Sequence, residues 1–529
     1  MSETVVGEKG MVVAPHRAAA EAGAAILREG GNAVEAMLAA AATIAVVYPH
    51  MNGIGGDGFW LIREPGRTPR YIEACGAAGS GATIGAYREK GHDRVPTRGP
   101  DAALTVAGAV SGWALAHQFA ASLGGRFDRR TLVEAAIGHA RAGVAVSRSQ
   151  ARMTAEHEAE LAPVPGFAAQ FMPGGKAPAT GDAMRFERLA DTLDQLAHEG
   201  FEDFYRGDVG ATIAADLAEA GAPVTRADLE RQEARFREPL SLRIAGATLY
   251  NAPPPTQGAA SLMILGLFER LGVARGEGFE HVHGLVEATK RAFQFRDARI
   301  TDPVFAGDLA PYLSDRALER EAAQIDMRRA AALGGGGAKG DTVWLGAIDA
   351  SGLAVSYIQS IFWEFGSGLT LPRTGIVWQN RGASFSLDPR ALNPLEPGRK
   401  PFHTLNPPLA RFDDGRVMSY GTMGGDGQPQ FQAALFTRHV RFGMDLAEAI
   451  AAPRWLWGKT WGADAAGLRV ESRLDADLVR DLERAGHRVE VLAEPYADLM
   501  GHAGAIVRRA DGRLFGASDP RSDGAAVAG

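Results

Sequence analysis

The chain has 529 residues, of which 46% are hydrophobic and 22% charged, a composition that is ordinary for a globular protein and argues against disorder. The net charge of −7 gives no basic surface of the kind that binds nucleic acid, so no nucleic-acid partner is expected. The single cysteine, Cys75, excludes an internal disulfide, a zinc site with paired thiolates and a C-x-x-C redox motif.

The start of the chain and its most apolar stretch both argue against a membrane partner. Residues 1–9 contain Glu3 and Glu8 and no apolar run, which is unlike a secretory signal. The stretch Ala33–Val47 is shorter than the ~20 residues of a membrane-spanning helix and contains Glu35. We therefore expect a buried core helix there and a cytoplasmic location.

In chain order, the first 330 residues are predicted to be mainly helical. Met11–His16 is typical of a strand that enters a turn. Glycines 30 and 31 end a helix over Ala18–Glu29, and Asn32 can cap the next helix over Ala33–Val47. A glycine turn at 53–58 precedes the strand Phe59–Ile62. Further helices are expected over Ala102–Leu123, Arg130–Ala142, Phe186–Gly200, Val209–Ala220, Arg226–Arg235 and His281–Thr301.

The pattern changes after the glycine-rich run 333–340, which cannot hold a helix. The turn Asp349–Gly352 indicates a hairpin, and one more helix is expected over Asp445–Ala452. A helix-rich first part and a strand-rich last part predict an α+β sandwich with helices covering its sheets. The strands expected after the run are Thr342–Ile348, Ala354–Ile361, Gly375–Trp378, Val417–Tyr420, Arg469–Glu471, Arg488–Val491, Ala503–Arg508 and Leu514–Ala517.

The sequence contains partial matches to several cofactor-binding motifs, but none of them has the required residues or context. Residues 53–58 match G-x-G-x-x-G, but they follow a helix and open a strand, the reverse of a dinucleotide-binding turn. Gly458-Lys459-Thr460 lacks the first glycine of a P-loop, because Pro453 stands at that position. The pair His281 and His283 is weak evidence for a metal, and neither H-E-x-x-H nor G-x-S-x-G occurs. We therefore expect neither a metal nor an organic cofactor.

The glycine run ends abruptly at Thr342, where a strand begins. One interpretation is a loop that enters a hairpin. The other is a self-cleavage site, at which the Thr342 hydroxyl attacks the Asp341 carbonyl and water resolves the resulting ester. The new chain then starts with an α-amine whose usual pKa is ~7.7–8.0. Thr342 would thus supply both the nucleophile and the general base.

Ordered sequence blocks along nearly the whole chain resemble the γ-glutamyltransferase family of N-terminal-nucleophile hydrolases. The resemblance implies a four-layer αββα sandwich that is made as one precursor and cut between Asp341 and Thr342. The expected products are a large subunit, residues 1–341, and a small subunit, residues 342–529. The blocks are Met11–His16, Gly30–Ala36, Gly53–Phe59, Asp203–Gly207, Pro253–Gly258, Phe365–Gly368, Gly424–Gly425 and Gly516–Ser522.

The resemblance also implies roles for individual residues. Thr342 matches the nucleophile, and the backbone N–H groups of Gly424 and Gly425 match the oxyanion hole, which a glycine turn leaves open to a tetrahedral intermediate. Ser360 stands where the family usually has a second threonine, so its hydroxyl is expected to support the Thr342 amine. The alternative for Ser360 is an ordinary strand serine.

The sequence departs from the family where the substrate amine and carboxylate would bind. The segment Tyr71–Gly81 carries no arginine at the expected place, and Gln379–Phe385 lacks both of the family's aspartates. The substrate-binding residues that we expect instead are Arg381, Asn380, His403, Thr404 and Phe362.

These exchanges remove the groups that receive an ammonium and add a guanidinium that can hold a carboxylate through two hydrogen bonds. Phe362 would make the pocket smaller and drier. The alternative for Arg381 is a structural ion pair.

The sequence therefore predicts hydrolysis of a small amide that carries a carboxylate, through an acyl-enzyme on Thr342, and it resembles the oxamate-amidohydrolase branch of the family. Three alternatives stay open: a γ-glutamyltransferase or glutathione hydrolase, a cephalosporin-type acylase, and an uncut inactive precursor. The expected partners are a small-molecule amide and the two subunits of one precursor, with a homodimer of that pair left open.

Overall fold

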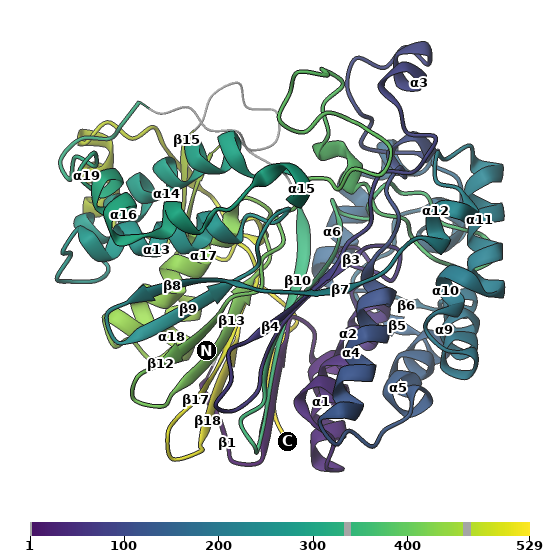
Figure 1. Cartoon of the computed structure of the whole chain (residues 1–529), viewed down its shortest axis with the longest axis horizontal. Helices are drawn as coiled ribbons and strands as arrows, with labels where there is room; N and C mark the ends of the chain where they lie inside the picture. Colours follow the sequence, from purple (N-terminus) through teal and green to yellow (C-terminus); the bar gives the residue numbers. More distant parts are fainter. Residues whose placement is uncertain (1–2, 333–339, 459–466) are drawn as a thin grey trace.

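The structure, a computed structural model, describes residues 3–332, 340–458 and 467–529. Two seven-stranded antiparallel sheets pack against each other, and helices cover both outer faces (Figure 1). The predicted four-layer αββα sandwich is confirmed. Among the described residues, none of the helices has the length and apolar character to cross a membrane.

Each sheet takes strands from both sides of the glycine run. One sheet has the order β1 (Val5–Gly7), β18 (Leu514–Ser518), β17 (Ala503–Arg508), β13 (Val417–Thr422), β12 (Leu409–Phe412), β9 (Ala247–Asn251) and β8 (Leu240–Ile244). The other has the order β19 (Ala525–Ala528), β2 (Gly10–Ala14), β10 (Asp341–Asp349), β11 (Ala354–Phe362), β3 (Asp57–Arg63), β4 (Arg70–Ala74) and β7 (Arg235–Arg237).

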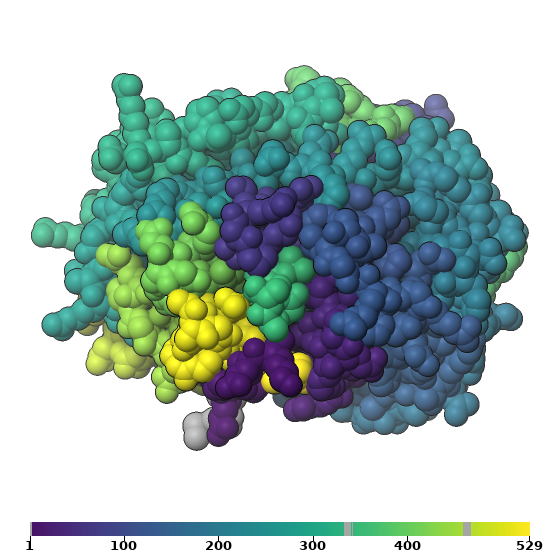
Figure 2. All heavy atoms as spheres, turned by 60° about the horizontal axis from the view of Figure 1, so that its bottom comes forward, coloured from purple at the N-terminus to yellow at the C-terminus, as the bar shows by residue number. Residues whose placement is uncertain are grey.

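The two ends of the chain meet in these sheets. β1 pairs with β18, and β2 pairs with β19. Figure 2 shows the purple N-terminal residues and the yellow C-terminal residues together on one face. β10 lies between β2 and β11: β11 pairs with it from Asp341 onward, whereas β2 pairs only with Gly346–Asp349.

Large apolar side chains of both sheets fill the space between them. Trp344 of β10 and Phe59 of β3 meet Ile506 of β17 in one buried cluster. The Trp344 indole donates to the Ser356 hydroxyl at 2.9 Å, which satisfies its polar atom inside the core. This packing explains why β11 is buried along its whole length.

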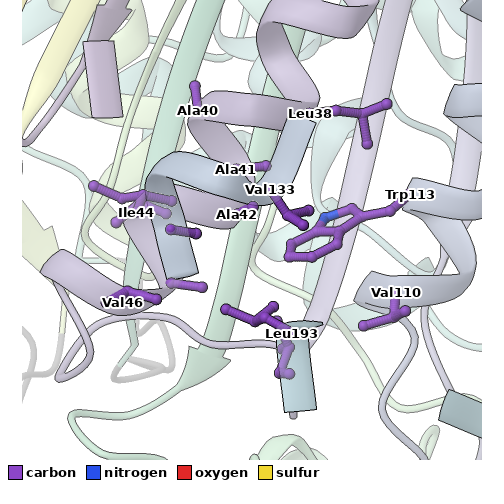
Figure 3. Packing of buried hydrophobic residues seen from close by; sticks show 14 of the residues in the cluster. Leu38, Ala40, Ala41, Ala42, Ile44, Val46, Val110, Trp113, Val133 and Leu193 are labelled. Atoms are coloured by element: carbon purple, nitrogen blue, oxygen red, sulfur yellow. The ribbon is translucent and has the colours of Figure 1, made fainter. Parts of the chain in front are cut away.

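One helical layer contains α1 (Arg17–Arg28), α2 (Ala33–Val47), α4 (Ala109–Ser122), α5 (Arg129–Ala142) and α9 (Glu187–Glu199). The predicted Asn32 cap is confirmed: its side chain accepts from Val34 and Glu35, and the Glu35 carboxylate accepts from Asn32 N. Every residue of α2 is buried, as expected for a core helix. Figure 3 shows Leu38, Trp113, Val133 and Leu193 gathered in this layer.

The other helical layer contains α13 (Gly258–Arg270), α14 (Phe279–Arg299) and α17 (Gly427–Phe436). The remaining helices are α3 (Ile84–Glu89), α6 (Arg148–Glu156), α7 (Glu158–Leu161), α8 (Phe167–Phe171), α10 (Asp203–Arg206), α11 (Asp208–Ala220), α12 (Arg226–Glu230), α15 (Pro303–Ala306), α16 (Asp315–Ala322), α18 (Leu446–Ala451) and α19 (Ala476–Arg484). A two-stranded ribbon pairs β5 (Val144–Ala145) with β6 (Ala183–Met184).

Two predicted helices were too long. The helix expected from Ala102 begins only at Ala109, because the chain before it is extended and Thr105 bridges to Ala78. The helix expected over Arg226–Arg235 ends at Glu230, and Arg235–Arg237 pairs with β4 as an edge strand.

One strand prediction was wrong. Gly375–Trp378 forms no strand, because only Val377 makes an isolated bridge, to Thr370. β15 (Gly467–Glu471) and β16 (Val489–Leu492) join β14 (Trp455–Gly458) in a separate three-stranded sheet. The strands predicted at Arg469–Glu471 and Arg488–Val491 are thus confirmed, and they lie outside the two large sheets.

Candidate active site

Thr342 lies buried at the start of the central strand β10. The register with β11 is irregular between Asp341 and Val343, so Thr342 sits at a bulge. The Gln428 side-chain nitrogen lies 3.5 Å from the Thr342 hydroxyl and donates to it. The Thr342 hydroxyl thus lies where the strand becomes irregular, with a side-chain amide donor beside it.

A chain of buried amides orients Gln428. Its carbonyl oxygen accepts from Asn406 Nδ2 at 3.2 Å, and the Asn406 carbonyl oxygen accepts from Asn251 Nδ2 at 3.2 Å. Because each amide fixes the orientation of the next, the Gln428 NH₂ group is turned toward Thr342.

Gly424 and Gly425 form the turn that leads into α17. Their φ angles are +116° and +53°, and the first lies where residues with a side chain are rarely found. The position of a Cβ on Gly340 would lie 3.4 Å from Gly425 Cα and 3.2 Å from the Phe362 ring. The chain just before Thr342 therefore runs between the glycine turn and Phe362, which brings the turn beside the predicted cleavage point.

We expect Gly424→Ala to reduce kcat by about 10², because its Cβ would meet the Phe431 ring at 3.0 Å and the φ of +116° would have to change. Loss of one oxyanion donor in a studied protease costs ~10²–10³ in kcat. The matched control is Gly443→Ala, at φ +73° with open space around the Cβ position. Full activity in Gly424→Ala, measured on protein of unchanged melting temperature, would place the oxyanion hole elsewhere.

Phe362 lies on the other side of the segment that precedes Thr342, and Ser360 contacts Phe362. The Ser360 hydroxyl accepts from Phe362 N at 2.8 Å. Phe362 has a φ of +84°, an unusual conformation for a side chain of this size. Ser360 thus holds a strained residue in place, and its support of the Thr342 amine stays a prediction.

Arg381 lies buried on the Phe362 ring, with 3.9 Å between the guanidinium carbon and the ring centre. Its Nη1 donates to the Thr404 hydroxyl at 3.3 Å, whereas Nε and Nη2 have no hydrogen-bond partner among the described residues. Burial lowers the pKa of Arg381 to about 9, against the opposing effect of Asp57. A buried guanidinium with two spare donors is arranged to receive an anion.

His403 and Asp57 are two further buried polar residues near Arg381. The two His403 ring nitrogens have no hydrogen-bond partner among the described residues, and Nε2 lies 3.5 Å from Asp57 Oδ2. Burial, and then Arg381 and Lys400, hold the pKa of His403 well below its usual value, so the ring is neutral. It can therefore donate one hydrogen bond and accept another.

No sequence pattern singled out Asp57, although it lies in the glycine-rich block 53–58. Its Oδ1 accepts from Gly76 N at 3.1 Å and from Gly108 N at 2.9 Å. Burial raises the pKa of Asp57 to about 7, while Arg381 opposes the rise. A carboxyl group that titrates near neutrality beside a spare guanidinium is a candidate functional group.

Asn380 has a different place from the one expected. Its oxygen accepts from Trp363 N at 3.1 Å, and its nitrogen donates to the Thr97 carbonyl at 2.8 Å. With both ends of the amide engaged by backbone, Asn380 holds the loop before Arg381. The structure brings Phe362, Arg381, Thr404 and His403 together with the glycine turn.

A second polar cluster lies away from this site. The ligand atoms of His283, Glu287 and His487 are within 4.8 Å of one another. However, His283 Nδ1 and His487 Nε2 share a hydrogen bond of 2.8 Å, and Lys290 Nζ donates to Glu287 at 2.6 Å. The cluster is satisfied by its own hydrogen bonds, and the Lys290 charge opposes a second cation, so it is best explained as structural.

A family model, two known proteins and a solved structure all resemble this chain. The family model described as gamma-glutamyltranspeptidase matches residues 19–529. The chain is 53% identical to the oxamate amidohydrolase proenzyme of Klebsiella pneumoniae and 40% identical to the glutathione hydrolase-like YwrD proenzyme of Bacillus subtilis, over the full length of each. The crystal structure of cephalosporin acylase from Bacillus halodurans superposes with a TM-score of 0.91 at 31% identity, covering 100% of this chain and 97% of that one.

Proposed function

The chain belongs to the gamma-glutamyltranspeptidase family, and from this premise we propose that it is a self-processing amidohydrolase whose substrate is oxamate or a similarly small amide acid. The observation that supports this substrate is Arg381, which is buried on Phe362 and has two donors without a partner among the residues that the structure describes. The high identity to an oxamate amidohydrolase proenzyme supports the same substrate class.

Processing comes first in the proposed mechanism. The Thr342 hydroxyl attacks the Asp341 carbonyl, and the C–N bond gives way to an ester. Water then hydrolyses the ester, which leaves a new carboxylate on Asp341 and a free amine on Thr342. The N–H groups of Gly424 and Gly425 stabilise the oxyanion of each tetrahedral intermediate.

Turnover then uses the same residue. The Thr342 amine takes the proton of the Thr342 hydroxyl while the oxygen attacks the amide carbon of the substrate. Collapse of the intermediate returns the proton to the leaving nitrogen, which departs as ammonia. Water hydrolyses the acyl ester, and for oxamate the second product is oxalate.

Arg381 and its neighbours select the acyl group. The fork of the guanidinium matches a carboxylate in geometry and charge. The His403 ring and the Thr404 hydroxyl lie near Arg381 and offer further hydrogen bonds. The Phe362 ring packs on the guanidinium and gives the site an apolar side. These features suit a short acid without an ammonium group.

The two subunits are proposed to stay together after the cut. β10 and β11 of the small subunit lie between β2 and β3 of the large one, so separation would break seven-stranded sheets. A homodimer of this pair and a cytoplasmic location remain predictions of the sequence.

A panel of amides tests the substrate. Purified, processed protein is given oxamate, glutamine, glutathione and a glutaryl amide, and the release of ammonia or amine is followed. We expect the highest kcat/KM with oxamate. A tenfold or greater preference for glutathione would favour a γ-glutamyl enzyme, and a preference for the glutaryl amide would favour an acylase.

The KM for oxamate is expected to rise several-fold between pH 6 and pH 8. Asp57, with a pKa of about 7, is neutral at the lower pH and leaves the Arg381 charge to the substrate. At the higher pH its carboxylate competes for Arg381 and repels the oxamate anion. Asp57→Asn keeps an acceptor for Gly76 N and Gly108 N and should make KM nearly independent of pH. The same slope in the variant would remove Asp57 from the binding step.

The free energy of unfolding should also depend on pH through the titration of Asp57. The folded pKa of Asp57 is raised above the unfolded value of ~3.9, so its contribution to stability falls as pH rises from about 4 to about 7 and is constant above that. Asp57→Asn removes this cost. The variant should therefore gain stability relative to wild type at pH 8 and show no such gain near pH 4, as measured by denaturant unfolding.

A further inference from the structure

We propose that Gln257 and Arg296 are positioning residues that align the oxyanion turn with the carboxylate-binding loop. This proposal rests on the proposed function, because it assigns the glycine turn to the oxyanion and the Thr404 loop to the substrate acid. We call Gln257, Arg296 and Asp426 the brace.

Gln257 links two loops that lie far apart in the sequence. Its side-chain nitrogen donates to the Gly425 carbonyl at 2.9 Å and to the Thr404 carbonyl at 2.7 Å. The first carbonyl belongs to the oxyanion turn, and the second belongs to the residue whose hydroxyl receives Arg381. One buried NH₂ group thus sets the spacing between the two loops.

Arg296 orients Gln257 and holds the other end of the turn. Its Nη1 donates to the Gln257 oxygen at 3.1 Å, which leaves the Gln257 nitrogen for the two carbonyls. The same guanidinium makes a two-point contact with the Asp426 carboxylate, at 2.8 and 3.2 Å. Stacking on Phe293, 3.8 Å from guanidinium carbon to ring centre, fixes its plane. Asp426 directly follows Gly425, so the brace holds the turn at consecutive residues.

The brace matters because a glycine turn does not hold its own shape. Gly424 and Gly425 have the backbone freedom of residues without side chains, yet oxyanion donors must stay within a few tenths of an ångström of their place. Gln257 is the N-cap residue of α13, and Arg296 lies in α14. Both helices belong to the helical layer that covers one sheet. They act through Gly425, Asp426 and Thr404 rather than by touching the substrate.

We expect Gln257→Leu to lower kcat for oxamate by about 10² and to change KM by less than threefold. The variant keeps the side-chain volume nearly unchanged and removes both donors. Gln257→Glu is the second variant, because its carboxylate keeps the contact with Arg296 and lacks the NH₂ group. Arg296→Lys keeps the charge but loses the planar fork, and we expect a smaller loss of about tenfold.

Arg438→Lys is the matched control. Arg438 is equally buried and makes a two-point contact with Glu277, at 2.6 and 3.1 Å, together with a bond to the Pro453 carbonyl. The same exchange there removes a buried fork without touching the glycine turn. We expect its kcat to stay within twofold of wild type, whatever the change in melting temperature.

The rate of self-processing is measured alongside oxamate hydrolysis in every variant, since cleavage uses the same oxyanion turn. A wild-type protein that processes itself but leaves oxamate intact would refute the proposed substrate. In that case the rate of self-processing tests the brace, and slower processing in Gln257→Leu and Gln257→Glu would support it. Wild-type kcat and processing in both Gln257 variants would overturn the brace. An equal loss of kcat in Arg296→Lys and Arg438→Lys would also overturn it.

Discussion

The Thr342→Ala variant is expected to remain a single chain of 529 residues, while the wild-type protein yields two fragments, residues 1–341 and 342–529. Without the hydroxyl, nothing on residue 342 can attack the Asp341 carbonyl, so the ester cannot form. The uncut variant should also show no amide hydrolysis, because the α-amine that acts as the base is never released. A denaturing gel and intact-mass measurement distinguish the two outcomes.

Two further variants make this test specific. Thr342→Ser keeps a hydroxyl and should still cut, at a lower rate. Thr289→Ala removes another buried threonine, whose hydroxyl donates to the Leu285 carbonyl in α14, and it should process as wild type does. Two fragments from purified Thr342→Ala, without added protease, would assign cleavage to a different nucleophile.

Local signals explain which parts of the fold could be predicted from the sequence. The bounds predicted for α2 are confirmed because the Asn32 cap and its Glu35 partner are encoded within four residues. The hairpin of β10 and β11 is confirmed, because residues 349–352 form its turn and strongly apolar strands flank it. α13 and α17 were missed because they are buried on nearly all sides, which leaves no amphipathic period to read.

Some residues of the candidate site could be proposed from the sequence, and others could not. Thr342 could be proposed because it follows the glycine run, the glycine pair because it lies in a family block, and Arg381 because its segment departs from the family pattern. Gln257 lies in the block Pro253–Gly258, but neither its role nor that of Arg296 could be proposed, because their partners are set by tertiary contacts: Gln257 and Gly425 are separated by 168 residues. Asp57 was missed for a similar reason, since its raised pKa comes from burial and not from its neighbours in the chain.

Arg381→Ala is expected to lower kcat/KM for oxamate by up to about 10³ and to affect neutral amides much less. Truncating one partner of a buried, hydrogen-bonded charge pair costs about 2–5 kcal/mol, and 1.4 kcal/mol corresponds to a factor of ten. Most of the change should appear in KM, because Arg381 holds the carboxylate in the ground state and the transition state alike. Arg381→Lys should recover part of the loss, since it restores the charge without the fork.

Glutathione should respond in the opposite direction. Its γ-glutamyl group carries an ammonium, which would lie near the Arg381 charge in a site where the family's two aspartates are absent. Like charges about 4 Å apart, at an effective dielectric near 20, repel by roughly 4 kcal/mol. Removing Arg381 relieves that repulsion, so the ratio of kcat/KM for oxamate to that for glutathione should fall sharply in the variant.

A stability comparison separates a binding role for Arg381 from a structural one. Arg454 is also a buried arginine, but its guanidinium is saturated by the Met500, Gly501 and Ile450 carbonyls and by Asp519. Arg454→Ala should therefore lower the melting temperature by several degrees, because it leaves buried acceptors without a donor. Within the described part of the chain, Arg381 has two donors without a partner, and burial lowers its pKa to about 9, so its charge costs stability in the folded state.

Arg381→Ala should accordingly melt at or above the wild-type temperature while it loses activity toward oxamate. A group that costs stability and is required for the turnover of one class of substrate is retained for that substrate. If Arg381→Ala instead melts as low as Arg454→Ala and loses activity equally toward oxamate and neutral amides, Arg381 is a structural residue. The carboxylate would then have to be held by the neutral His403 ring and the Thr404 hydroxyl.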